Sequence, residues 1–165
     1  MKTLGEVFAS QFGINLPQQA SKGELTQLDI NKQSRLIILS VNFARLIDRN
    51  LLFEAEKSIT KVLAYHAVIK PHFPTELFSA DYFSQLYIAV RRDIPSINGT
   101  LNNAEVKFEN NILTINLLNG GKSLLDSKGF DKALVKLISE EFNLHISVNY
   151  KGTFEIEENS EEYKA

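Results

Sequence analysis

Alternating apolar and polar residues run from residue 106 to residue 115, with a break at Asn110 and Asn111. The two halves of this run predict two β-strands, each with one apolar face. Asparagine tolerates the positive φ of a tight hairpin turn, so the break predicts a hairpin. Apolar residues at helical spacing follow between residues 130 and 142, and residues 145–150 alternate again. The stretch therefore predicts a hairpin, then a helix, then a closing strand.

The same order of elements is predicted between Leu25 and Phe73. Residues 25–30 and 36–43 are apolar runs separated by a polar cluster, which predicts a first hairpin. Asp48 is a predicted N-cap for the helix that follows, and residues 66–70 predict a strand that ends at Pro71. The apolar stripe of the helix is Leu52, Ala55, Ile59, Val62 and Leu63, and the residues predicted to face water are Glu54, Glu56, Lys57 and Lys61.

These patterns predict an α+β fold of two small ββαβ-type units, each with helices packed on an antiparallel or mixed sheet. Residues 1–23 form an N-terminal amphipathic segment and loop, residues 24–93 the first unit, residues 94–152 the second unit, and residues 153–165 an acidic linker. A helix that begins near Ser79 or Asp81 and ends before Pro95 is assigned to the first unit. The likeness of the two units lies in element order, since no sequence repeat is visible.

The composition indicates a globular protein, because 44% of the 165 residues are apolar and the chain can bury a core. Cysteine is absent, which excludes a disulfide framework and thiolate metal sites and fits a reducing cytoplasm. The start of the chain lacks the apolar core of a signal peptide. No run approaches the roughly 18 apolar residues of a membrane span. We therefore expect a soluble, cytoplasmic protein.

The net charge of −2 is unevenly distributed. Residues 154–165 hold five glutamates and one lysine, a local charge of −4, so the rest of the chain carries +2. A body charge this small does not indicate a nucleic-acid-binding domain, which is expected to be clearly basic.

Gly121, Lys122 and Ser123 follow a predicted strand and open a predicted helix, which is the context of a phosphate-binding loop. The first glycine of that motif is missing, because Asn116 occupies its position inside the strand. Backbone amides that cradle phosphate need a glycine-rich turn there. A plain turn is therefore the favoured interpretation.

Candidate metal ligands and catalytic groups are scattered along the chain. His66 and His72 lie on one extended segment and His145 lies elsewhere, without the spacing of a zinc site. Single carboxylates at turns and helix starts are explained by capping, and these are Asp29, Asp81, Asp93, Asp126 and Asp131. The sequence therefore predicts no cofactor, no metal, no small-molecule substrate and no autonomous enzyme activity.

Two binding surfaces are candidates instead. Exposed apolar side chains off the core stripes predict a protein-binding surface, and the candidates are Leu4, Phe8, Phe12, Phe53 and Ile88. Basic side chains predict a nucleic-acid surface if the fold gathers them, and the candidates are Lys57, Lys61, Lys70, Arg91 and Arg92. The simpler interpretation of the basic residues, as solvated helix faces, is favoured.

Several segments carry a likeness to a known family, and they are Phe8–Leu16, Gly23–Lys32, Leu36–Phe43, the helix after Arg49, Ile94–Leu101 and Ala104–Ile115. In their residues and order they resemble the N-terminal region of the PolC-type DNA polymerase III alpha subunit of low-GC Gram-positive bacteria. The resemblance covers nearly the whole chain in element order and includes no catalytic motif.

The resemblance implies a leading fragment of a replicative DNA polymerase with 3′–5′ exonuclease, whose catalytic modules would follow residue 165. It implies a first domain similar to the C-terminal domain of the clamp-loader tau subunit and a second similar to a type II KH fold. The Gly-x-x-Gly loop of KH domains is absent, since Gly120 and Gly121 have the wrong spacing and follow a strand.

Three functions are therefore expected in order of preference. The first is a non-catalytic module that tethers the polymerase to the replisome through tau. The second is an accessory domain of the same enzyme that binds single-stranded or template nucleic acid. The third, independent of the resemblance, is a stand-alone protein-binding domain.

Overall fold

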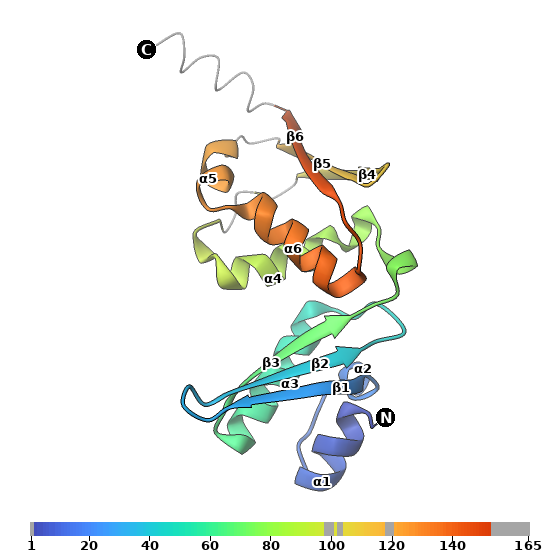
Figure 1. Ribbon diagram of the computed structural model, residues 1–165, viewed down its shortest axis with the longest axis vertical. Helices are drawn as coiled ribbons and strands as arrows, with labels where there is room; N and C mark the ends of the chain where they lie inside the picture. The colour runs from blue at the N-terminus through green and yellow to red at the C-terminus, as the bar shows by residue number, and fades with distance from the viewer. Residues whose placement is uncertain (1, 98–100, 102–103, 118–120, 153–165) are drawn as a thin grey trace. The chain divides into compact units, whose positions relative to one another are not determined.

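The computed structural model describes residues 2–97, 101, 104–117 and 121–152, which form the coloured ribbon of Figure 1. The chain divides into two compact units, Met1–Leu77 and Phe78–Ala165. The boundary precedes helix α4 (Phe83–Asp93), whereas the sequence pattern predicts it after residue 93. The difference arises because α4 packs on helix α6 (Phe130–Phe142) of the second unit.

Each unit contains a three-stranded mixed sheet with the same topology (Figure 1). The middle strand pairs antiparallel with the strand before it and parallel with the strand after the helix. The elements of the first unit are β1 (Glu24–Asn31), β2 (Leu36–Asn42), α3 (Arg49–Leu63) and β3 (His66–His72). Those of the second are α4, β4 (Glu105–Glu109), β5 (Ile112–Leu117), α5 (Lys122–Ser127), α6 and β6 (Ser147–Gly152). The predicted α+β class with two ββαβ units is confirmed.

Both hairpin turns have local causes in the sequence. Asn110 and Asn111 adopt φ values of 52° and 61° between β4 and β5, which confirms the predicted turn. Between β1 and β2, the Asn31 carboxamide oxygen accepts hydrogen bonds from the backbone N–H groups of Gln33 and Ser34. Such Asx geometry fixes a turn without help from the rest of the fold.

Helix α3 is capped at both ends. The Asp48 carboxylate accepts a hydrogen bond from Asn50 N at 2.9 Å, which confirms the predicted N-cap. At the other end Ala64 adopts a left-handed φ of 58°. Arg35 donates hydrogen bonds to the Ala64 carbonyl, and its guanidinium lies 5.1 Å from the centre of the Tyr65 ring. A cation at this end also suits the helix dipole.

Replacing Ala64 by glycine is expected to raise the free energy of unfolding by about 0.5–1 kcal/mol, because glycine has no Cβ penalty at positive φ. Urea denaturation of the two proteins measures the change. Ala133→Gly is the matched control: it lies inside α6, where glycine costs about 1 kcal/mol. A loss of stability in Ala64→Gly would contradict this account of the cap.

Three details of the first unit differ from those predicted. Glu56 is buried rather than facing water, and Val62 is 53% exposed although it was assigned to the apolar stripe. Strand β3 runs through Pro71 to His72 instead of ending at the proline. Pro71 is tolerated because β3 is an edge strand and its missing N–H would point outward.

The N-terminal segment is an integral part of the first unit. A π-helical turn (Gly5–Ala9) and the short helices α1 (Ser10–Phe12) and α2 (Gln18–Ser21) lie beside the sheet (Figure 1). Leu4 N donates to Gly23 O and Leu25 N donates to Lys2 O, each at 2.9 Å. The chain start therefore pairs with the beginning of β1.

Aromatic rings dominate the core of the second unit. Phe142 is fully buried, and its ring centre lies 5.2 Å from that of Phe78 and 5.6 Å from that of Tyr82, both in edge-to-face geometry. The fully buried stripe of α6 is Phe130, Leu134, Ile138 and Phe142.

None of the helices in the described ranges combines the length and the apolar character that a membrane span requires.

Candidate functional site

The suspected phosphate loop has another arrangement. Lys122 Nζ lies 2.7 Å from Asp126 Oδ2, one turn later in α5. Its ammonium group therefore faces a carboxylate of its own helix. Residues 118–120 lie outside the described part of the chain.

The turn between α5 and α6 is the place where a KH-type loop would have to lie. It contains Gly129, but the residue three positions earlier is Asp126, and Lys128 lies between the helices. The second glycine that such a loop requires is therefore missing. The arrangement does not favour a grip on nucleic acid here.

The histidines and the described carboxylates lie apart from one another. Among the residues that the structure describes, no group of three or more such side chains is placed to hold an ion. His66 and His72 lie on β3 and His145 lies in the other unit.

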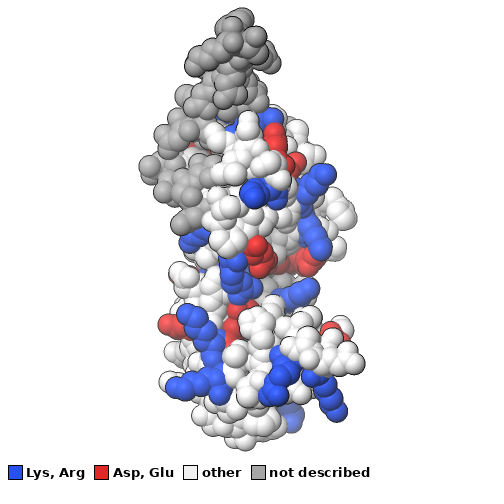
Figure 2. All heavy atoms as spheres, turned by 90° about the vertical axis from the view of Figure 1, so that its left-hand side faces the viewer, with Lys and Arg blue, Asp and Glu red and all other residues white. Residues whose placement is uncertain are grey.

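The candidate nucleic-acid contacts of the first unit lie on two different faces of that unit. Lys57 and Lys61 are exposed on α3, whereas Lys70 lies on the opposite face of the sheet, since its neighbours Ile69 and Pro71 are buried beneath the helix. Arg91 and Arg92 belong to the second unit, where Arg91 lies 5.4 Å from the Tyr87 ring centre and Arg92 lies 4.0 Å from Asp93. On the face drawn in Figure 2, basic side chains occur in several small groups with neutral and acidic side chains between the groups.

The five candidate protein contacts differ in exposure. Phe12 is 51% exposed, but Leu4 and Phe8 are buried. Leu4 and Phe8 are therefore core residues of the first unit, because the pairing of residues 2–4 with β1 draws the segment into the fold. Phe53 and Ile88 are half-buried.

An apolar surface that the sequence pattern does not predict lies along β1. Leu28 is 43% exposed and Ile30 is 53% exposed. They pair with Leu39 and Ile37, which are buried under α3, so they lie on the helix side of the sheet. Val62 projects from the flank of α3 nearer to β1, because Glu56 and Thr60 occupy its other flank, against β3. We call Leu28, Ile30 and Val62 the β1 surface.

The outer edge of β3 is closed to a further strand. Ala67 N donates to Thr60 Oγ1 at 2.9 Å, and Ile69 N donates to Glu56 Oε2 at 2.8 Å. Pro71, the next residue whose backbone points outward, has no N–H. All the outward donors of this edge are therefore occupied or missing.

Beyond its first residues, the outer edge of β1 pairs with no other segment of the described chain. Phe43 N donates to His72 O, so the odd-numbered residues of β2 direct their backbone N–H and C=O groups toward β3. The even-numbered residues of β2 direct theirs toward β1. In this register the peptide groups of Leu28 and Ile30 point away from the sheet. Their side chains and backbone groups thus lie on the same open edge, which is a template for an added strand.

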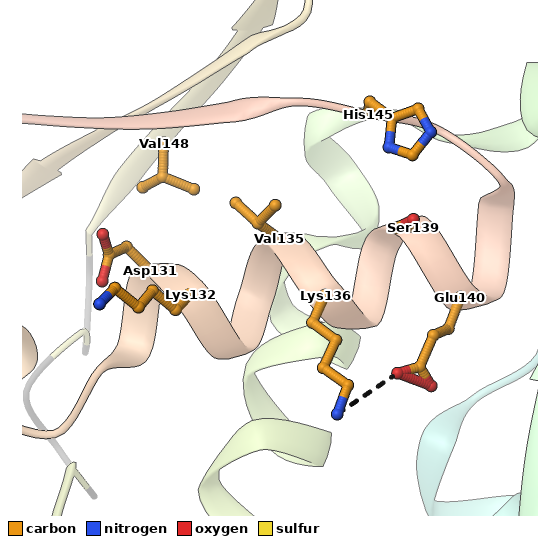
Figure 3. A pocket seen from close by; sticks show the side chains of 8 residues that line it. All are labelled: Asp131, Lys132, Val135, Lys136, Ser139, Glu140, His145 and Val148. Atoms are coloured by element: carbon orange, nitrogen blue, oxygen red, sulfur yellow. Dashed lines mark ion pairs between the residues drawn. The ribbon is translucent and has the colours of Figure 1, made fainter.

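In the second unit, a groove of about 560 Å³ runs between α6 and β6 (Figure 3). Val135 and Val148 face each other in its middle, Asp131 and Lys132 lie at one end, and His145 lies at the other. The remaining lining residues are Lys136, Ser139 and Glu140. Lys136 and Glu140 form an ion pair at 4.0 Å on the solvent rim.

Tyr150 on β6 has an unusual hydroxyl. Burial, and then the negative charges of Asp131 and Asp126, raise the pKa of this hydroxyl above its ordinary value. Within the described residues it has no hydrogen-bond partner. The group therefore stays protonated at neutral pH and is able to donate.

Comparison of the chain with protein-family models, curated proteins and solved structures finds no match.

Proposed function

We propose that this chain is a non-catalytic protein-interaction module whose β1 surface binds an extended segment of a partner protein. The single observation that supports this function is the combination of exposed Leu28 and Ile30 side chains with outward-facing backbone groups on the same strand. Strand addition uses both: backbone hydrogen bonds supply affinity, and pockets for alternate side chains supply specificity.

The partner that we propose is the clamp-loader tau subunit. The resemblance to the N-terminal region of PolC-type polymerase alpha subunits supports this choice, since such a polymerase would work in a replisome that contains tau. In that setting the module would tether the polymerase while the catalytic modules of the parent enzyme perform the chemistry. The outward donors of the β3 edge are already occupied, so a strand of tau would add to this sheet at β1 alone. The partner would therefore bind on a defined side of the module.

Ile30→Lys is expected to weaken tau binding by about 1–3 kcal/mol, the range of an interface anchor, while leaving the fold intact. A lysine at this position would place a desolvated charge in an apolar contact. Isothermal titration calorimetry with the full chain and purified tau measures the change.

Gln27→Lys is the matched control, because it adds the same charge to the same strand but on the other face of the sheet. It is expected to bind tau with nearly unchanged affinity. Equal losses in both variants would point to charge rather than to the β1 surface. Steeply salt-dependent DNA binding without tau binding would instead support an accessory nucleic-acid domain.

A further inference from the structure

The two units can be compared position by position, since their helices and closing strands have matching landmarks. Helix α3 ends at Ala64 and helix α6 ends at Asn143, and both caps have left-handed φ. His66 N donates to Arg35 O at the start of β3, and Ser147 N donates to Asn111 O at the start of β6. Counted from the caps, Thr60 corresponds to Ser139 and Glu56 corresponds to Val135.

The residues that close the β3 edge are therefore not reproduced in the second unit. Glu56 accepts a hydrogen bond from the outward N–H of Ile69 on β3. Val135, at the equivalent position of α6, has no side-chain atom that can accept one. By the same register, the N–H groups of Val148 and Tyr150 point outward from β6. No side chain among the described residues accepts a hydrogen bond from either of them.

The connection between helix and strand is also longer in the second unit. Ala64 and Tyr65 link α3 to β3, whereas residues 143–146 link α6 to β6. A longer connection allows α6 to stand away from the edge of β6. The groove of Figure 3 lies in this space, with β6 along one side and α6 along the other.

We propose that the groove between α6 and β6 binds an extended segment of a partner protein, which adds as a strand to the outer edge of β6. The site is separate from the β1 surface and does not depend on it. Strand addition beside a helix needs free edge groups and a wall for alternate side chains, and both are present here.

The lining indicates the chemistry of the bound segment. A residue opposite Val148 would direct its side chain toward Val135, which favours a β-branched apolar side chain such as valine. The residues of the bound segment two positions before and after that central residue would contact the ends of the groove. Asp131 and Lys132 lie at one end and Ser139 and His145 at the other, and these polar groups favour hydroxyl side chains. Asp131 and Glu140 balance Lys132 and Lys136, so the groove offers no net positive charge to a phosphate backbone, and a peptide is favoured over nucleic acid.

The probe for the test is the blocked peptide acetyl-Thr-Lys-Val-Lys-Thr-amide, titrated into the isotope-labelled full chain and followed by amide NMR. The expected result is a shift of the Val148 and Tyr150 amide signals and slower exchange of these two amides with solvent. Val135→Glu is expected to weaken the peptide at least about tenfold, because its carboxylate would occupy the edge as Glu56 does in the first unit.

Val135→Thr is the control of matched shape and is expected to keep the affinity within about threefold. If Val135→Glu does not fold, the ligand-free wild type still tests the premise: Val148 and Tyr150 amides should exchange about tenfold or more faster than those of Ala67 and Ile69. Equal protection of the two pairs, or no response of Val148 and Tyr150 to millimolar peptide, would overturn the proposal. If the peptide binds only after residues 153–165 are removed, the groove is a site for the chain's own residues, and the proposal of a partner protein is overturned.

Discussion

Phe142→Ala is expected to lower the free energy of unfolding of the second unit by about 3–5 kcal/mol, the range for removal of a buried phenylalanine. Phe142 is fully buried at the end of α6 and contacts the rings of Phe78 and Tyr82. Because alanine fills little of this space, both the burial of the ring and its edge-to-face contacts are lost. Urea unfolding measures the change.

Phe12→Ala is the control for this substitution, because Phe12 is 51% exposed on the first unit. Its loss is expected to cost less than about 1 kcal/mol. Residue-resolved amide exchange should assign the effect of Phe142→Ala to the second unit alone. A loss below about 1 kcal/mol at Phe142 would mean that the aromatic cluster does not hold this unit together.

Glu56→Ala is expected to destabilise the first unit by about 1–3 kcal/mol, because the buried N–H of Ile69 loses its acceptor. The change would also expose an unpaired donor on the edge of β3. We therefore expect weaker protection of the Ile69 amide against hydrogen exchange, together with a lower midpoint in urea.

Glu54→Ala serves as the matched control, since it removes the same carboxyl group from an exposed position of the same helix. Its expected effect lies within about 0.5 kcal/mol. Similar losses in the two variants would show that helix propensity or net charge, rather than the closed edge, determines the result.

The parts of the fold that depend on neighbouring residues were predictable from the sequence. The asparagine pair at the β4–β5 turn and the Asp48 cap act over two or three residues, and both are observed. Alternation and helical spacing also predicted the order of strands and helices in both units. These signals are local, so they do not require knowledge of which elements meet.

Features that depend on contacts between distant segments were not predictable in the same way. Leu4 is buried because the chain start pairs with β1, some twenty residues later in the sequence. Glu56 was expected to face water, but it lies on the flank of α3 that covers the β3 edge. Charge and periodicity alone do not show which flank of a helix faces an edge strand.

The β1 surface was missed for a related reason. Leu28 and Ile30 alternate with polar residues, which normally indicates an inward face. Their pairing partners Leu39 and Ile37 are indeed buried, so Leu28 and Ile30 lie on the inward face of the sheet. Helix α3 packs on β3, however, and leaves Leu28 and Ile30 of β1 exposed. A single sequence carries no signal for which strand of a sheet a helix covers.

The most direct test of the proposed function is hydrogen exchange of the Leu28 and Ile30 amides in the full chain, with and without saturating tau. If a strand of tau adds to β1, these outward amides gain an acceptor and their exchange should slow by about tenfold or more, while the already bonded Ala67 and Ile69 amides change little. Tau binding with unchanged exchange at Leu28 and Ile30 would contradict the assignment of the β1 surface, and no binding at all would contradict the proposed partner.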